Sequence, residues 1–207
     1  DMLIGASNAP MTAIEWTMSH LLNNSNALDK SIEEIEFHVG HEKLVDEVDL
    51  PKLNYLQNVI SESLRLHPPV PLLIPHISSH ECTIGGYEIP KDTILLVNVW
   101  AIQRDPKLWG KEATSFKPER FENGKKFEGY NSKLLPFGLG RRSCPGMELG
   151  NRVVGLALGC LLQCFEWKRV GEEEIDMTEL GKGLNLDKGE PLQALCRPRG
   201  MAKKLLS

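Results

Sequence analysis

The stretch FGLGRRSCPG, residues 137–146, is the most informative part of this sequence, and it precedes the helical pattern that holds the longest apolar run. Gly138 and Gly140 permit tight turns and a close approach of the backbone to a flat ligand. Cys144 comes just before the predicted helix, where unpaired N–H groups and the positive helix end favour a thiolate over a thiol. Arg142 adds positive charge nearby. The segment therefore predicts a glycine-rich loop that presents an anionic sulfur.

Three interpretations of this loop stay open from local features alone. It is a structural loop with an incidental cysteine, a catalytic cysteine nucleophile, or the source of a single thiolate ligand to haem iron. A nucleophilic cysteine needs a histidine base, and the nearest histidine in sequence, His80, lies more than 60 residues from Cys144. Folding could still bring a histidine close. A haem ligand needs only one cysteine, which fits the loop.

Length and composition describe a globular chain. The 207 residues suffice for one good-sized domain, and 24 Lys and Arg against 28 Asp and Glu give a net charge of −4. A mildly acidic chain gives no support for nucleic-acid binding. The longest apolar run, 153–162, is half of the roughly 20 residues that a membrane-spanning helix needs. Because the chain opens at Asp1, without a signal peptide and inside a helical pattern, we expect it to be a fragment.

The five cysteines do not form a recognisable framework. Their spacings are irregular and no CxxC pair occurs, which argues against a zinc ribbon, a thioredoxin motif or a disulfide scaffold. Cys160 and Cys164 sit in the apolar run, so we expect both to be small buried hydrophobes.

The apolar periodicity predicts a mainly α-helical fold with small β-sheets. Pro10 predicts a kink in the first helix, Ser31 is the expected cap of the second, and the last helix is apolar nearly all round, so it should be buried. Gly85-Gly86 marks a turn between strands, and 105–135 shows no sustained period. The predicted helices cover 1–23, 29–39, 53–66 and 147–165, and the predicted strands cover 72–77, 82–84 and 94–99, with short strands and loops after 166.

The glycine-rich loop matches the signature F-x-x-G-x-R-x-C-x-G of the cytochromes P-450 at every fixed position. Glu62 and Arg65 resemble the E-x-x-R of that family's K helix, and residues 118–121 resemble its P-E-R-F segment. The resemblance runs along essentially the whole chain. It implies that 1–207 is the C-terminal portion of a single cytochrome P-450 domain, with the distal helix end, K-helix region, meander, cysteine loop and proximal helix, and with the N-terminal part missing.

The resemblance also implies a cofactor and its ligands. Cys144 would be the axial thiolate of haem b, iron protoporphyrin IX. Arg142 and His76 would pair with haem propionates, and Phe137 would pack near the thiolate and limit water. Gly138 and Gly140 would let the backbone approach the ring. Glu62, Arg65 and Arg120 would form a buried charge cluster that fixes the meander behind the cysteine loop.

The first helix departs from the family pattern. Where the family has an acid and a threonine that steer protons to bound oxygen, this chain has Asn8 and Ala9. Asn8 cannot relay a proton as a carboxylate does, and Ala9 has no hydroxyl. Ser7, one position away, could substitute. A drifted or wrongly joined exon end and an altered oxygen chemistry both remain open, so haem binding is more secure than monooxygenase activity.

Within the family, the segments around 98–106 and 144–146 resemble plant microsomal enzymes, and Glu15-Trp16 and the His76 segment resemble isoflavone hydroxylases. This implies a haem-thiolate monooxygenase that inserts one oxygen atom from O2 into a small aromatic plant metabolite such as an isoflavonoid. Electrons would come from NADPH through NADPH-cytochrome reductase. The protein would lie at the cytosolic face of the endoplasmic reticulum membrane, held by the missing N-terminal anchor.

Two alternatives come from other classes. Asn8 and Ala9 suggest a haem-thiolate isomerase or dehydratase that needs no oxygen activation. The missing N-terminal portion suggests a truncated, non-functional product that binds no haem.

Overall fold

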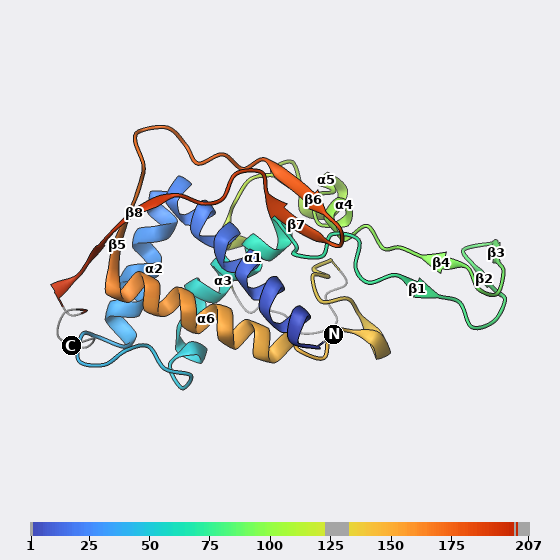
Figure 1. The fold of residues 1–207 in the computed structure, drawn as a ribbon, viewed down its shortest axis with the longest axis horizontal. Coiled ribbons are helices and arrows are strands. Elements are labelled where there is room, and N and C mark those ends of the chain that lie inside the picture. The colour runs from blue at the N-terminus through green and yellow to red at the C-terminus, as the bar shows by residue number, and fades with distance from the viewer. Residues whose placement is uncertain (1, 123–132, 201, 203–207) are drawn as a thin grey trace.

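Four long helices pack together into the body of the molecule (Figure 1). The computed structural model describes residues 2–122, 133–200 and 202. The long helices are α1 (Met2–Asn23), α2 (Ser25–His38), α3 (Asn54–Leu66) and α6 (Met147–Cys164). Short helical turns lie between them: η1 (Leu50–Lys52), α4 (Val99–Ile102), α5 (Pro106–Trp109), η2 (Pro118–Phe121) and η3 (Gly140–Arg142). Two of these turns, α5 and η2, fall in the stretch 105–135 predicted to be irregular.

The strands form four small antiparallel pairs. Two of the pairs make an arm that extends away from the helices, and the other two lie along the body (Figure 1). Gly85 and Gly86 turn the chain at the arm's tip with φ angles of 59° and 86°, as predicted. The mainly α-helical prediction with small sheets is therefore confirmed. The pairs are β1 (His76–Ile77) with β4 (Ile94–Leu95), β2 (Cys82–Ile84) with β3 (Tyr87–Ile89), β5 (Phe165–Arg169) with β8 (Ala194–Pro198), and β6 (Glu179–Lys182) with β7 (Asn185–Lys188).

Three local predictions are wrong. Helix α2 begins at Ser25, and Ser31 is no cap: its Oγ lies inside the helix and donates to the carbonyl of Ala27 at 2.7 Å. The predicted strand 94–99 ends at Leu95, because the side chain of Asn98 accepts the N–H of Ala101 at 2.9 Å and starts α4. The predicted strand 72–77 shrinks to its last two residues.

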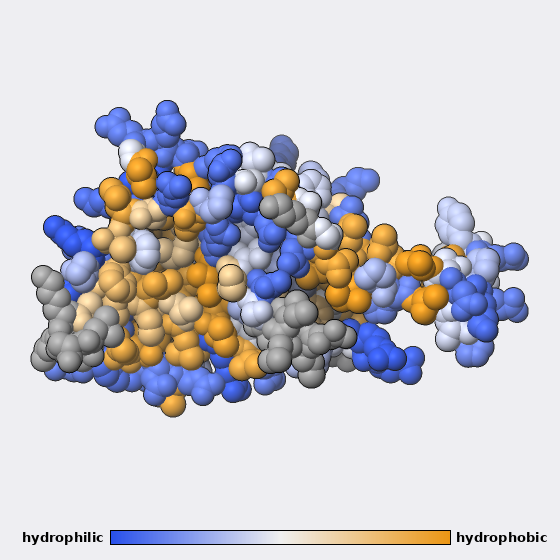
Figure 2. Space-filling view, in the orientation of Figure 1, coloured by the Kyte–Doolittle hydropathy of each residue, from blue (hydrophilic) through white to orange (hydrophobic). Residues whose placement is uncertain are grey.

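Helix α6 is buried on one side only, although its composition predicted burial all round. Leu158 and Leu162 are fully buried, whereas Leu149 and Val153 are 63% and 42% exposed. Figure 2 shows a broad apolar area on the face where α6 lies. Cys164 is buried as expected, and Cys160 is half-buried.

Two glycines of α6 let neighbouring side chains lie close to the helix backbone. A Cβ built at Gly155 would stand 3.2 Å from Cδ2 of Leu50, and one at Gly159 would stand 3.1 Å from Cγ1 of Val45. At both positions the neighbour is a side chain and not another backbone. None of the described helices combines the length and hydropathy needed to cross a membrane.

Candidate functional site

The glycine-rich loop forms a compact turn ahead of α6. The N–H of Cys144 donates to the carbonyl of Phe137 at 2.8 Å, which closes the loop. Gly138 and Gly140 have φ angles of 71° and 83°, in the left-handed region that favours glycine. Gly146 is the N-cap of α6, so the cysteine stands two residues ahead of the cap. The loop geometry thus holds the cysteine backbone in one place close to the helix start.

The polar groups of this loop lie at the surface. The side chains of Cys144 and Arg142 are exposed, and Cys144 is a free thiol. Within the described part of the chain, neither Arg141 nor Arg142 forms an ion pair. Phe137 is half-buried and packs against the hydrophobic core. The thiol of Cys144 and the two guanidinium groups are therefore accessible, while Phe137 anchors the start of the loop to the core.

These features fit a haem. A cysteine thiolate is a soft ligand suited to iron, and the fork of Arg142 suits a carboxylate such as a propionate. A Cβ built at Gly140 would meet nothing within 4 Å, so the backbone there is open to a flat ligand. No group of three or more His, Cys, Asp or Glu side chains in the described residues could hold a metal ion. A single thiolate to an iron that a porphyrin already holds needs no such group.

The segment that leads to His76 passes beside the loop at Leu73. A Cβ built at Gly138 would stand 3.6 Å from Cδ1 of Leu73, three residues before His76. The ring Nδ1 of His76 bonds the carbonyl of Ile74 at 2.7 Å, which orients an otherwise exposed imidazole. The segment that bears His76 thus passes beside the loop that bears Cys144.

Ser7 and Asn8 lie on the first turns of α1, and both are exposed. Helix α1 packs against α6, the helix that follows the cysteine loop. The helix continues through Pro10, which lies inside it. The structure therefore puts the two predicted oxygen-side residues on a helix that neighbours α6.

The predicted charge cluster behind the loop is present. Nε and Nη2 of Arg65 pair with the two carboxylate oxygens of Glu62 at 2.6 and 2.8 Å, and both side chains are fully buried. Nε of Arg120 reaches the same carboxylate at 3.1 Å. Nη1 of Arg65 also donates to the carbonyls of Gln103 and Ala113, each at 2.6 Å. The cluster fastens α3 to the long connection that leads to the cysteine loop.

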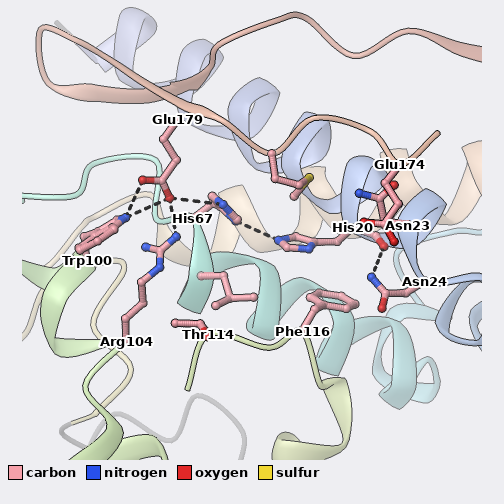
Figure 3. Close-up of a pocket in the computed structure, with 12 residues that line it drawn as sticks. His20, Asn23, Asn24, His67, Trp100, Arg104, Thr114, Phe116, Glu174 and Glu179 are labelled. Atoms are coloured by element: carbon pink, nitrogen blue, oxygen red, sulfur yellow. Dashed lines mark hydrogen bonds and ion pairs between the residues drawn. The ribbon is translucent and has the colours of Figure 1, made fainter. Parts of the chain in front are cut away.

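Sequence analysis missed a second buried polar network, which lines a cavity of about 560 Å³ (Figure 3). Nε2 of His20 and Nδ1 of His67 lie 2.9 Å apart, and Nε2 of His67 lies 3.4 Å from Oε1 of Glu179. Glu179 also pairs with Arg104 and accepts from Nε1 of Trp100 at 2.9 Å. Figure 3 shows these side chains in a row along one side of the cavity.

Both histidines of this network are neutral. Burial lowers the pKa of His20 from 6.5 to about 3, with nearby cations such as Arg104 adding to the effect. Burial also moves the pKa of His67 far below its usual value. The contact between the rings is therefore an ordinary hydrogen bond between two uncharged imidazoles, one donating and one accepting.

The profile of a protein family described as cytochrome P-450 matches residues 1–193. The chain belongs to the cytochrome P-450 family. The solved structures agree: a zebrafish cytochrome P-450 with progesterone matches at a TM-score of 0.84 and 32% identity, over 96% of this chain and 44% of that one. The four helices and small sheets are therefore part of the cytochrome P-450 fold.

The relatives include plant enzymes. The chain is 55% identical to an isoflavone 3'-hydroxylase of Medicago truncatula over 95% of its own length and 38% of that protein. It is 50% identical to an isoflavone 2'-hydroxylase of Glycyrrhiza echinata over 99% of its length and 40% of that protein. The predicted resemblance to plant cytochromes P-450 is confirmed. The chain spans about 40% of the length of these curated relatives.

Proposed function

We propose that the protein containing this chain is a haem-thiolate monooxygenase that inserts one oxygen atom from O2 into a small aromatic plant metabolite such as an isoflavonoid. Membership of the family supports the oxidative chemistry. The two isoflavone hydroxylases among the relatives support the substrate class. The observation that carries the proposal is the closed loop that presents the free, accessible thiol of Cys144 beside the start of α6.

Haem b is the proposed cofactor, with Cys144 as the axial ligand and Arg142 and His76 on the propionates. When bound, the haem supplies oxygen activation, and electron donation from the thiolate favours cleavage of the O–O bond. The chain's own contribution is to hold the sulfur. Phe137 contributes in two ways: its carbonyl accepts the N–H of Cys144, and its side chain packs against the hydrophobic core. Gly140, where a built Cβ would meet nothing within 4 Å, leaves room for the ring's flat face, and Gly138 lets the loop turn tightly beside Leu73.

Asn8 and Ser7 are the proposed residues on the oxygen side. An amide donates and accepts hydrogen bonds but neither gains nor loses a proton near neutral pH. Asn8 would therefore orient a water or substrate group, and the Ser7 hydroxyl would be the donor closest to it in sequence.

Asn8 and Ala9 favour a second candidate, a haem-thiolate isomerase or dehydratase. Such an enzyme rearranges its substrate without activating O2 and so does not need a proton-relaying carboxylate at position 8. The second candidate keeps the haem and the Cys144 ligand and removes the need for electrons.

The remaining proposals concern the whole protein. Electrons would come from NADPH through NADPH-cytochrome reductase, at the cytosolic face of the endoplasmic reticulum membrane. Residues 1–207 would be the C-terminal portion of a single domain. Long-range contacts support this last point: Nε1 of Trp16 donates to the carbonyl of Leu186 at 2.9 Å, and Glu15 accepts the N–H of Leu192 at 2.8 Å.

The two candidate activities differ in their need for electrons and O2. The test supplies an isoflavonoid to the haem-loaded protein with isotopically labelled O2, with and without NADPH and reductase. A monooxygenase forms a product that carries one labelled atom, and only when NADPH and reductase are both present. Product that forms at the same rate without NADPH, and without label, would contradict the monooxygenase proposal and support the isomerase or dehydratase.

A further inference from the structure

Gln103 joins three segments of the chain that lie far apart in sequence. It follows α4, and its side chain is fully buried. Nε2 donates to the carbonyls of Leu64 and Arg65 at 3.1 and 2.9 Å. Oε1 accepts the N–H of Leu135 at 2.7 Å. Each polar atom of the amide therefore has a partner on the backbone.

The two carbonyls that Gln103 binds have no helical donor of their own. In an α-helix each carbonyl accepts the N–H four residues later. For Leu64 and Arg65 those residues are Pro68 and Pro69, which carry no N–H. A buried carbonyl left without a donor destabilises the fold, because it loses the hydrogen bond that water gives it in the unfolded chain. The end of α3 therefore needs an outside donor, and the amide of Gln103 supplies it to both carbonyls.

The acceptor end of the same amide leads to the cysteine loop. Leu135 stands two residues before Phe137, whose carbonyl accepts the N–H of Cys144 at 2.8 Å. The series from the end of α3 through Gln103 and Leu135 to the closed loop consists of backbone groups and one rigid amide. A change at Gln103 would thus reach Cys144 through two intermediate hydrogen bonds.

We infer that Gln103 is a positioning residue for Cys144, which fixes the base of the cysteine loop to the C-terminal end of α3. This inference rests on the proposed haem-thiolate function. Loss of the amide frees the N–H of Leu135 and lets the loop shift relative to α3. The expected consequence is a weaker thiolate ligand, because the backbone that carries the sulfur would no longer be held in one place.

Gln163 offers a matched control in another part of the molecule. It is 3% exposed, its Oε1 accepts the N–H of Val45 at 3.0 Å, and its Nε2 donates to the carbonyls of Gly40 and Lys43 at 3.1 and 3.0 Å. The pattern is the same as that of Gln103, with one N–H accepted and two carbonyls satisfied. The residues that Gln163 holds belong to the loop between α2 and η1, not to the segment that leads to Cys144.

The experiment compares Gln103→Met with Gln163→Met in the haem-loaded protein that contains this chain. Methionine keeps the length of the side chain and removes all three hydrogen bonds. The readouts are the melting temperature and the share of the reduced, CO-bound protein that absorbs at the thiol-ligated rather than the thiolate-ligated Soret position. We expect similar losses of melting temperature. We also expect the thiol-ligated share to rise about fivefold in Gln103→Met alone, the factor that corresponds to about 1 kcal/mol.

A second variant protects the test against misfolding. In this fully buried site beside two carbonyl oxygens, Gln103→Glu favours the neutral acid, which keeps an oxygen that accepts the N–H of Leu135 and offers one O–H donor to α3 in place of two N–H donors. We expect its thiol-ligated share to lie between those of wild type and Gln103→Met. Equal shares in Gln103→Met and Gln163→Met, or a Gln103→Glu variant as impaired as Gln103→Met, would overturn the positioning role.

Amide hydrogen exchange in the protein that contains this chain separates this inference from the proposed function. Gln103→Met should speed exchange at Leu135 and Cys144, and Gln163→Met should leave both rates unchanged. Unchanged rates in Gln103→Met would overturn the inference whatever the haem does. A wild-type protein with no thiolate band would refute the haem-thiolate function, while the exchange rates would still decide whether Gln103 holds the loop.

Discussion

Glu62 is a fully buried carboxylate whose two oxygens face two guanidinium groups and the N–H of Lys117. Breaking such a buried pair from one side is costly, because the partner charge stays behind without compensation. We expect Glu62→Ala to lower the free energy of unfolding by about 3–5 kcal/mol, measured by chemical denaturation.

An exposed ion pair provides the comparison. Nζ of Lys30 lies 2.9 Å from Oε1 of Glu119, and both side chains are more than 40% exposed. Lys30→Met should therefore cost far less stability than Glu62→Ala, because water screens the pair. An equal loss of unfolding free energy in Glu62→Ala and Lys30→Met would mean that the buried cluster does not fasten α3 to the connection that leads to the cysteine loop.

The paired histidines predict a pH dependence of stability. The pKa of His20 in the folded chain is about 3, below its unfolded value of 6.5, so the unfolded state binds more protons as pH falls below 6.5. The stabilisation is thus complete above pH 6.5 and is lost progressively toward pH 3. Between pH 7 and pH 5, His20→Gln should lose about 2 kcal/mol less stability than wild type, by linkage for one titrating group.

Denaturation curves at a series of pH values check this. A His20→Gln variant that loses as much stability as wild type between pH 7 and pH 5 would show that His20 is not buried as a neutral ring.

At the scale of elements, the contact of α6 with the loop before η1 depends on Gly159, which has no side chain. Cβ, Cγ1 and Cγ2 of Val45 would all lie within 3.1–3.4 Å of a Cβ at Gly159. Val45 cannot yield easily, because it is buried and its N–H is held by Gln163. Gly159→Ala should therefore lower the free energy of unfolding by about 1–3 kcal/mol through overpacking.

Gly150 lies in the same helix and has nothing within 4 Å of a built Cβ. Gly150→Ala should be neutral or stabilising by up to about 1 kcal/mol, because alanine favours the helix. Thermal melts of the two variants make the comparison. A Gly159→Ala variant as stable as Gly150→Ala would contradict the tight packing of α6 on Val45.

Local signals predicted the elements where one rule dominates. The apolar spacing predicted α3, and Gly85-Gly86 predicted the turn of the arm. The family motifs indicated the cysteine loop and the charge cluster. The rule failed where a single polar side chain changed the outcome: Asn98 turned a β-like run into α4, and Ser31 bonded within its own helix.

The buried networks lay beyond local patterns, because their partners are distant in sequence. Gln103 bonds residues 38, 39 and 32 positions away, and His20 bonds a ring 47 positions away. Pro68 and Pro69 do indicate in the sequence that two carbonyls of α3 need other donors, but they do not identify the residue that supplies them.

At the scale of the whole molecule, hydrogen bonds join α1 and other segments that are distant in sequence. The β6–β7 hairpin is held to α1 through the indole of Trp16, and to the segment after α3 through the N–H of Leu186 and the carbonyl of Pro69 at 3.0 Å. The cysteine loop touches that segment at Leu73. These contacts join α1, the β6–β7 hairpin, the segment after α3 and the cysteine loop to one another.

The most direct measurement is the absorption spectrum of the reduced, CO-bound, haem-loaded protein. Wild type should show the long-wavelength Soret band that is diagnostic of thiolate ligation, and Cys144→Ser should abolish it, because a serine hydroxyl does not replace the thiolate. Cys196→Ser, at an exposed free cysteine on β8, should keep the band. An unchanged band in Cys144→Ser would contradict the account.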